Sequence, residues 1–315
     1  MKRLYATLLA ALVGLAAGAT HAQDGANCPP QATPPTPQQL QQAQARAKDR
    51  GFLWRVSKDG RTHHLYGTIH VGTLDWAVPG PRVRTALLDA QAIALEIDPL
   101  DPAIQSSLRG GGSAAPKLAP ALAEQLARQV RRACLPAQML SGLHPMMQAM
   151  TVLVMEAARD GLHAGYGQEF MLAGFARARG LNVVSLETPE RQLAALVPAD
   201  PVQAERAVAL TVEQLDSGLA RRVLQRMAAA WERGDLDELA DYERWCDCMN
   251  TAEERALLVA LNDERNPAMA DKVTALHGEG RRLFVAVGAL HMTGPKALPA
   301  LLRARGFQVE RVAFQ

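Results

Sequence analysis

Short apolar segments that favour β-strands lie near both ends of this 315-residue chain, and a long helix-rich stretch separates them. Strands are predicted at residues 52–56, 64–69, 92–97, 182–187, 282–288 and 307–314, and residues 190–277 are almost wholly helical by pattern. Strands at the two ends with helices between them favour one sheet. The sequence therefore predicts an α/β (α+β) fold with a central mixed sheet, flanking helices and a large helical insertion.

Turn and cap residues divide the rest of the chain. Asp59-Gly60 lies between the first two predicted strands and is typical of a tight hairpin turn. Breaks in the long helical stretch are expected near Pro198, Gly234 and Pro267. Further helices are predicted at residues 37–49, 81–89, 120–134, 139–160, 167–179 and 295–305.

The amino-terminal segment has the parts of a secretory signal peptide. Met1–Arg3 is basic, residues 8–19 are small and apolar, and either 17–19 or 20–22 offers a small-residue cleavage site. The apolar run is shorter than the roughly 18 residues that a membrane span needs, so no integral membrane anchor is expected. We therefore predict a signal peptide (1–22), a Pro/Gln-rich arm (23–49) and a single domain (50–315) of a periplasmic or secreted protein.

The composition argues against two classes of protein. Hydrophobic residues make up 48% of the chain and charged residues 21%, which is enough apolar material for a full core and excludes disorder as the main state. Lys and Arg total 34 against 32 Asp and Glu, and no polybasic run stands out. A nucleic-acid binder that depends on phosphate contacts is therefore not expected.

Four cysteines fit an oxidising compartment. Bonding Cys246 to Cys248 across one residue is expected to be strained, so each of them is predicted to pair with Cys28 or Cys134. The alternative is a Cys-x-Cys site for a soft metal ion.

Two predicted strands end in the same motif, Gly-x-x-His. Gly67 precedes His70, and Gly288 precedes His291. Glycine lets the backbone leave the strand sharply, and each histidine then projects from the carboxyl end of its strand. In open α/β sheets, ligands bind beyond those ends, so both imidazoles are candidates for one site.

Two other predicted strands end in carboxylates. Glu96 and Asp98 lie at the end of one strand, two residues apart on one face, and Glu187 ends another. A charge at the end of an apolar strand is costly to bury unless it is paired or bound to a metal ion. Two histidines and two glutamates at one rim suit a divalent transition metal or a His/Glu acid–base pair.

The remaining histidines and motifs carry weaker signals. His63 and His64 flank the hairpin turn and are expected to be exposed, whereas His277 is expected at a helix C-terminus. The sequence has no His-Glu-x-x-His motif, no Gly-x-Ser-x-Gly motif and no phosphate loop. Standard metalloproteases, α/β-hydrolases and nucleotide enzymes are therefore disfavoured.

These motifs together resemble the TraB/PrgY/GumN family, whose animal branch includes the Tiki proteases, and the chain is most similar to the exported GumN-like bacterial branch. The matching segments are Phe52–Val56, Tyr66–Gly72, Ala94–Asp98, Gly167–Glu169, Val184–Thr188, Arg265-Asn266 and Val287–His291. The resemblance implies a fold shared with erythromycin-esterase-like and ChaN-like proteins. It also implies a metal-dependent protease site with manganese or cobalt, or alternatively zinc, built around His70, His291 and Glu96.

The resemblance and the strand ends lead to one mechanistic hypothesis. His70 and His291, with Glu96 or Glu169, hold a divalent ion, and the remaining carboxylate acts as general base. Glu169 stands where the family pattern has Asp. Arg265 stabilises an oxyanion or forms a structural salt bridge, and Glu187 is a further catalytic candidate.

The predicted function is a metal-dependent hydrolase of peptides or other small substrates. Three alternatives remain open at this point: a haem- or iron-binding protein on the same scaffold, a metal-free His/Glu esterase, and a non-catalytic accessory protein.

Overall fold

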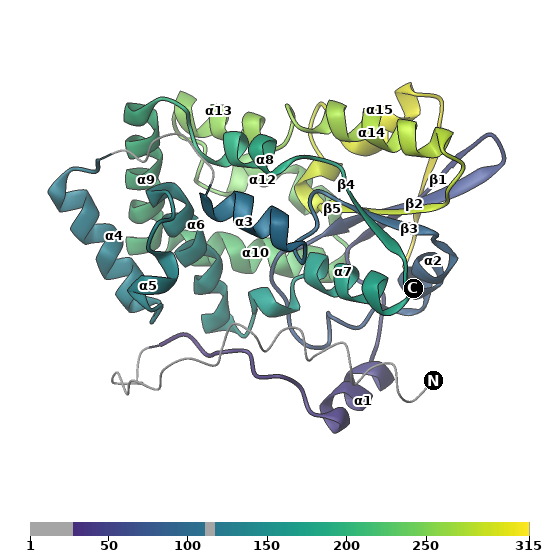
Figure 1. Ribbon diagram of the computed structural model, residues 1–315, viewed down its shortest axis with the longest axis horizontal. Helices are drawn as coiled ribbons and strands as arrows, with labels where there is room; N and C mark the ends of the chain where they lie inside the picture. The colour runs from purple at the N-terminus through teal and green to yellow at the C-terminus, as the bar shows by residue number, and fades with distance from the viewer. Residues whose placement is uncertain (1–27, 111–116, 315) are drawn as a thin grey trace.

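A computed structural model describes residues 28–110 and 117–314 of the chain (Figure 1). The predicted signal peptide lies outside the described residues. Six strands form one mixed sheet in the order β4-β3-β5-β2-β1-β6, which confirms the predicted α/β class. The strands are β1 (Phe52–Lys58), β2 (Arg61–Thr68), β3 (Ala92–Leu95), β4 (Asn182–Ser185), β5 (Leu283–Gly288) and β6 (Gln308–Val312).

The strand directions bring four carboxyl ends to one edge of the sheet. β2 is parallel to β5, β5 to β3, and β3 to β4, whereas β1 is antiparallel to both of its neighbours. Thr68 at the end of β2 lies opposite Gly288 at the end of β5. Because these four strands end side by side, the residues that follow them emerge into the same region.

The β1–β2 hairpin forms where the sequence predicts it. Asp59 and Gly60 have φ angles of 50° and 72°, the left-handed conformations that a tight two-residue hairpin requires. Every residue of β3 is buried, as expected of a strand covered on both faces.

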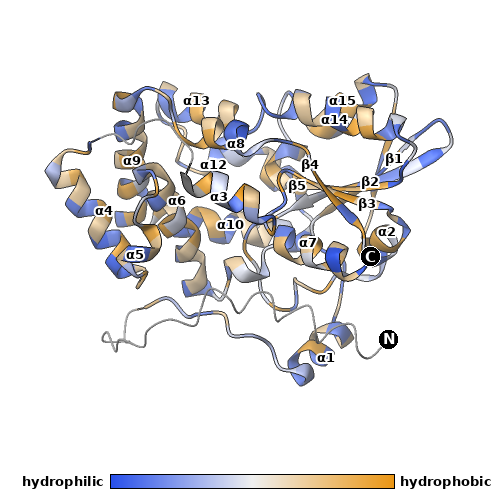
Figure 2. Ribbon diagram, in the orientation of Figure 1, coloured by the Kyte–Doolittle hydropathy of each residue, from blue (hydrophilic) through white to orange (hydrophobic). Residues whose placement is uncertain are grey.

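Helices cover the sheet on both sides. In Figure 1, α14 and α15 lie above the strands and α2 and α7 lie below them. The sheet-covering helices are α2 (Pro81–Asp89), α7 (Gln168–Ala178), α14 (Asn266–Gly278) and α15 (Leu298–Ala304). Helix α1 (Pro37–Ala45) belongs to the arm that precedes the first strand. Figure 2 shows hydrophobic residues concentrated along the central strands between them.

The predicted helical insertion forms a helical lobe, which we define as residues 117–160 and 189–261. Its helices are α4 (Pro120–Arg132), α5 (Ala137–Leu140), α6 (Pro145–Glu156), α8 (Pro189–Leu196), α9 (Pro201–Asp216), α10 (Leu219–Arg233), α11 (Leu236–Ala240), α12 (Tyr242–Trp245) and α13 (Ala252–Leu261). α4, α6, α9 and α10 pack together around small cores of their own. Helix α3 (Pro102–Gly110) and the 3₁₀ turns Ala157–Asp160, Ala164–Tyr166 and Ala289–Met292 complete the elements.

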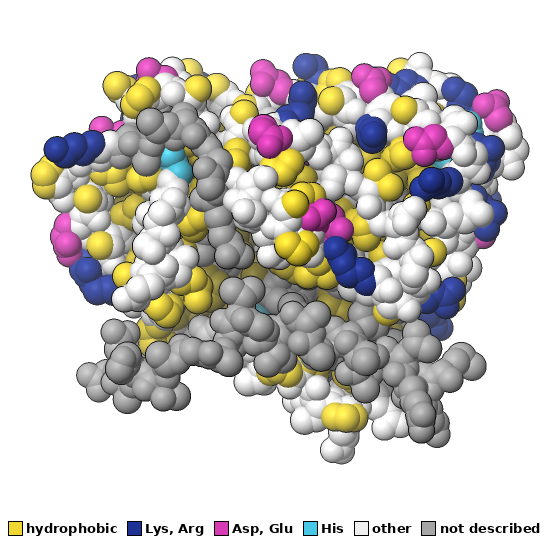
Figure 3. Space-filling view, viewed as in Figure 1, with side chains coloured by type: hydrophobic (Ala, Val, Ile, Leu, Met, Phe, Trp, Pro, Cys, Tyr) yellow, Lys and Arg dark blue, Asp and Glu magenta, His cyan; other side chains and the backbone are white. Residues whose placement is uncertain are grey.

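The helix boundaries differ from the sequence prediction in one stretch. Residues 139–160 are not one helix, because the chain breaks at 141–144, where Gly142 has a φ of 85°. Pro145 then starts α6, and the His144 side chain caps it by accepting a hydrogen bond from the N–H of Met146. Among the described residues, no helix is both long and apolar enough to cross a membrane. Figure 3 shows acidic and basic side chains interspersed on this face of the described residues.

The predicted cysteine pairing is wrong. Cys28 pairs with Cys134, and Cys246 pairs with Cys248. Asp247 between the latter two has a φ of 51°, and this left-handed bend brings their Cα atoms to 5.1 Å, well inside the range for a disulfide. Asp is one of the residues that adopts this conformation readily, so the expected obstacle to a Cys-x-Cys bond is absent.

Breaking the Cys28–Cys134 bond is expected to lower the free energy of unfolding by about 2–4 kcal/mol, because the bond spans 106 positions and restricts the unfolded chain strongly. The measurement is urea unfolding of the Cys28→Ser/Cys134→Ser double variant. The Cys246→Ser/Cys248→Ser double variant is the matched control, since its bond closes a loop of only two positions. Equal losses in the two variants would contradict the expectation.

The expectation that His63 is exposed is also wrong, because its side chain points into the protein and is 1% exposed. Its Nδ1 accepts a hydrogen bond from the N–H of Leu283, and its Nε2 lies 2.8 Å from Nδ1 of His277, in the last turn of α14. Burial lowers the pKa of His63 to about 4, and the neighbouring His277 and Arg61 act in the same direction.

This buried ring predicts a specific acid sensitivity. Between pH 6.5 and about 4 the unfolded chain binds a proton at His63 that the folded chain does not, so stability falls as the pH falls through this window. At pH 4.5, two units below the ordinary pKa, the loss is expected to be about 2–3 kcal/mol at about 1.4 kcal/mol per pKa unit. Urea unfolding at pH 7 and pH 4.5 should show a smaller loss for His63→Gln than for the unchanged protein. Parallel losses would contradict a neutral buried His63.

Candidate active site

His70 follows β2 and lies beside the N-terminus of α7. A Cβ atom at Gly167 would lie only 2.4 Å from the carbonyl oxygen of His70, so the absence of a side chain there lets α7 approach closely. This approach places Oε1 of Glu169 at 3.2 Å from Nδ1 of His70. The hydroxyl of Thr68 donates a hydrogen bond to the same carboxylate oxygen. Glu169 therefore orients the His70 ring from behind.

The charge state of His70 follows from this contact. Attraction to the Glu169 carboxylate raises the pKa of His70 to about 9, so the ring is a cation near pH 7 and a metal ion would have to displace the proton on Nε2. Because a carboxylate only accepts hydrogen bonds, Nδ1 of His70 is the donor, and in the neutral ring Nε2 carries the lone pair. The side chain is 64% exposed, so Nε2 can be reached from solvent.

His291 lies in the 3₁₀ turn after β5 and is buried. Its Nδ1 lies 2.6 Å from Oδ1 of Asn266. The amide nitrogen of Asn266 donates to the carbonyl of Lys296 at 2.9 Å, which fixes the amide so that its oxygen faces the ring. Nδ1 of His291 is thus the donor, and Nε2 carries the lone pair. Burial lowers the pKa of His291 to about 4, so the ring is neutral near pH 7.

Glu96 follows β3 and faces His291. Its Oε1 lies 3.7 Å from Nε2 of His291 and accepts a hydrogen bond of 2.8 Å from the N–H of Gly288. Its Oε2 accepts a hydrogen bond from Arg265. Burial alone would raise the pKa of Glu96, but the imidazoles, Arg265 and the N–H of Gly288 outweigh burial and lower it. An ionised oxygen and an imidazole lone pair of two buried side chains therefore face each other.

Gly288 marks the point where these groups converge. A Cβ atom on Gly288 would lie 3.3 Å from Oε1 of Glu96, 3.6 Å from Cδ2 of His291 and 4.0 Å from Nε2 of His70. The structure thus brings His70, His291 and Glu96 around one small space, although the two histidines come from opposite ends of the chain.

Arg265 joins two strand-end carboxylates beside that space. Its guanidinium donates to both oxygens of Glu187, to Oε2 of Glu96 and to the carbonyl of Leu261. The Glu187 side chain is fully buried and Arg191 lies 3.6 Å from it. Since all three nitrogens of Arg265 already donate, this arrangement favours a positioning role for Arg265 and Glu187, and their predicted catalytic roles stay predictions.

Some predicted neighbours separate, and other contributors escaped the sequence analysis. Asp98 turns away from Glu96 and pairs with Arg177 of α7 at 2.8 Å, because β3 ends at Leu95. Asn266 was identified only as half of an Arg-Asn pair, and its bond to His291 depends on folding across 25 positions. The N–H of Gly288 had no sequence signal as a hydrogen-bond donor.

Comparison with known proteins adds the family. A model of the TraB/PrgY/gumN family matches residues 52–311, which run from β1 into β6 and include every candidate site residue. The chain belongs to the TraB/PrgY/gumN family. The resemblance seen in the sequence motifs is therefore confirmed.

Two curated relatives of this TraB/PrgY/gumN family member have the same name. The chain is 27% identical over 256 residues to Uncharacterized protein YbaP of Escherichia coli (strain K12), and the match covers 79% of this chain and 90% of the relative. The protein of that name from Shigella flexneri matches to the same extent. No solved structure matches the chain. These names assign no activity, so the site's chemistry has to be argued from its geometry.

The donor set in this family member suits a divalent metal ion by its chemistry. Neutral imidazole nitrogens and a carboxylate oxygen are ligands of first-row divalent ions. Both rings donate their other N–H to a side-chain oxygen, as metal-ligating histidines usually do. Within residues 28–110 and 117–314, however, no three His, Cys, Asp or Glu side chains already stand as ligands around one point. Of the three candidate ligands, His70 has the exposed ring, so it is the side chain that can move toward a bound ion.

Proposed function

We propose that this TraB/PrgY/gumN family member is an exported, metal-dependent hydrolase of peptides or other small substrates. The observation that carries the proposal is the 3.7 Å approach of Nε2 of His291 to Oε1 of Glu96. Both atoms are acceptors on buried side chains, and a bound cation would relieve that arrangement. His70, His291 and Glu96 would hold the ion.

Each group around these three has a definable task. Asn266 and Glu169 hold the Nδ1 atoms of the two rings as hydrogen-bond donors, so that each ring turns its Nε2 atom toward Glu96. Nε2 is free in the neutral His291 ring, and in His70 it would lose its proton when the ion binds. Arg265 and the N–H of Gly288 hold Glu96 ionised and fix its orientation. A divalent ion bound there would polarise a substrate carbonyl and acidify water. The exposed side of His70 is where a substrate can enter.

Export is supported by the disulfides as well as by the amino-terminal pattern. All four cysteines of the chain are paired, and such bonds persist in oxidising compartments. The measurement is fractionation of cells that express the full chain, followed by mass determination of the mature protein, which is expected to begin after residue 19 or 22. Recovery of the intact chain in the cytoplasm would contradict export.

The Gly288→Ala variant tests the metal site directly. The backbone of Gly288 has φ −49° and ψ 140°, which alanine adopts freely, so the substitution does not strain the backbone. The added methyl group occupies the space between the side chains of His70, His291 and Glu96. We expect the variant to lose manganese or cobalt binding in calorimetric titration and to lose chelator-sensitive hydrolysis of a peptide library. The control is Gly278→Ala, where no atom lies within 4 Å of the added methyl group. Unchanged metal binding in Gly288→Ala would sink the proposed site.

A further inference from the structure

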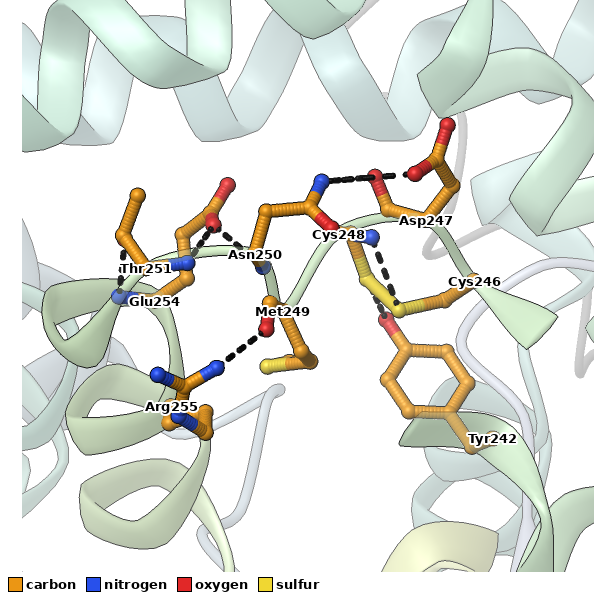
Figure 4. The surroundings of a disulfide bond; sticks show 9 residues. All are labelled: Tyr242, Cys246, Asp247, Cys248, Met249, Asn250, Thr251, Glu254 and Arg255. Carbon is orange, nitrogen blue, oxygen red and sulfur yellow. Dashed lines mark hydrogen bonds between the residues drawn. A yellow bond between two sulfur atoms is a disulfide. The ribbon is translucent and has the colours of Figure 1, made fainter. Parts of the chain in front are cut away.

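The Cys246–Cys248 disulfide lies in the loop between α12 and α13, far along the chain from the proposed metal ligands (Figure 4). Its two cysteines are separated by a single residue, Asp247. A bond that spans two positions restricts the unfolded chain little, so it contributes little to folding. By linkage, a disulfide that stabilises the fold weakly is also easier to reduce than one that stabilises it strongly.

The loop is held in place without the sulfur atoms. The side-chain amide of Asn250 donates to the carbonyl of Asp247 at 3.1 Å, and Arg255 donates to the carbonyl of Met249 at 2.7 Å. Glu254 accepts the N–H of Asn250 at 2.7 Å. Figure 4 shows the bonds of Glu254 and Arg255, both in α13, to one side of the disulfide, and the bond from Asn250 to Asp247 beside Cys248. Opening the disulfide therefore leaves the loop with its main supports.

Each sulfur atom accepts a hydrogen bond that would stabilise a thiolate. The N–H of Cys248 donates to Sγ of Cys246 at 3.1 Å, and the hydroxyl of Tyr242 donates to Sγ of Cys248 at 3.3 Å. A thiolate accepts hydrogen bonds more strongly than a disulfide sulfur does, because it carries a full charge. Both donors therefore favour the reduced form and make each cysteine a better leaving group.

An open groove leads to one of the two sulfur-bearing residues. The groove has a volume of about 610 Å³, within the range of ligand sites, and Cys248 and Tyr242 line it together with Met146, Met150, Leu210 and Leu257. Cys246 is fully buried and does not line it, whereas Cys248 is 9% exposed and reaches the groove. Helix α13 contributes apolar side chains to the groove and has no fully buried residue. A thiol that enters with an apolar segment thus meets Cys248 first.

We propose that the Cys246–Cys248 disulfide is a thiol–disulfide exchange site that oxidises dithiols of apolar peptide segments bound in this groove. A peptide thiolate attacks Sγ of Cys248, the S–S bond breaks, and Cys246 leaves as a thiolate that accepts the N–H of Cys248. A second peptide thiolate then attacks the peptide sulfur of the mixed disulfide, and Cys248 leaves toward the Tyr242 hydroxyl. Two electrons and two protons pass from the peptide dithiol to the protein, and a low-molecular-weight disulfide such as oxidised glutathione restores the bond.

The first test compares the two disulfides of the full chain in glutathione buffers, with alkylation and mass spectrometry as the readout. We expect Cys246–Cys248 to open at a ratio of reduced to oxidised glutathione at least ten-fold lower than Cys28–Cys134, which serves as the internal reference. Tyr242→Phe removes one donor and should shift only the Cys246–Cys248 equilibrium, several-fold toward the disulfide. If both bonds open together, or if Cys28–Cys134 opens first, the proposal is overturned.

The second test measures transfer of the bond to a synthetic leucine-rich peptide with two cysteines. One peptide disulfide should form per oxidised protein molecule, and none with the Cys246→Ser/Cys248→Ser double variant. Leu257→Trp fills the groove and should slow transfer at least five-fold. Val259→Trp is the matched control, because Val259 is on the same helix but is 42% exposed and lies outside the groove. A peptide that stays reduced overturns the exchange activity, and an unaffected Leu257→Trp variant overturns the groove as its route.

Discussion

Replacing His291 with alanine is expected to weaken binding of a divalent ion by more than about 100-fold, because losing a group that only orients a ligand already costs about 10–100-fold. The change removes the lone pair that faces Oε1 of Glu96 at 3.7 Å. The same variant should lose chelator-sensitive hydrolysis down to the background rate. Calorimetric titration with manganese and cobalt measures the first effect, and turnover of a peptide substrate measures the second.

Two companion variants separate binding from folding. His291 is buried, so its loss also removes packing, whereas His70→Ala changes a side chain that is 64% exposed and should lower the melting temperature less. Asn266→Leu keeps the His291 ring but removes the acceptor for its Nδ1, and should weaken metal binding by about 10–100-fold. Full metal affinity in both alanine variants would remove the two rings from the site.

The sheet could be predicted because its strands carry local signals. Segments such as residues 92–97 are short, apolar and bounded by turn residues, and the Asp59-Gly60 turn has one favoured geometry. The strand order is a different matter, since β5 enters between β2 and β3 from far along the chain. The break at Gly142 and the Cys246–Cys248 bond were missed because each depends on a left-handed backbone conformation that composition alone does not reveal.

The site was predictable only as far as its strand ends. Parallel strands place their carboxyl ends at one edge, so His70, Glu96 and His291 could be expected to meet. Their protonation states depend on Asn266 and Glu169, which reach the rings through tertiary packing. The burial of His63 could not be read from its place near a turn either, because His277 and Leu283 bind it from across the fold.

Replacing Arg265 with leucine is expected to lower the free energy of unfolding by about 3–5 kcal/mol, the usual cost of leaving a buried charge without its partner. Arg265 bridges Glu96 and Glu187, whose side chains are 7% and 0% exposed. Without the guanidinium, two carboxylates remain buried side by side. Urea unfolding measures the loss. Arg177→Leu is the control, because Arg177 is 42% exposed in its pair with Asp98, and its loss should cost about 1 kcal/mol or less.

A second change shows whether the buried charge is the cause. Adding Glu187→Gln to Arg265→Leu removes one of the two stranded carboxylates, so the double variant should be more stable than Arg265→Leu alone. Glu187→Gln by itself should be destabilising, because it leaves Arg265 with Glu96 as its one remaining carboxylate partner among the described residues. Glu187→Gln would thus lower the free energy of unfolding when Arg265 is present and raise it when Arg265 is replaced. Such a change of sign is expected when the three charged side chains are energetically coupled. If Glu187→Gln destabilises both backgrounds equally, the loss in Arg265→Leu comes from packing, and Arg265 does not hold Glu96 through charge.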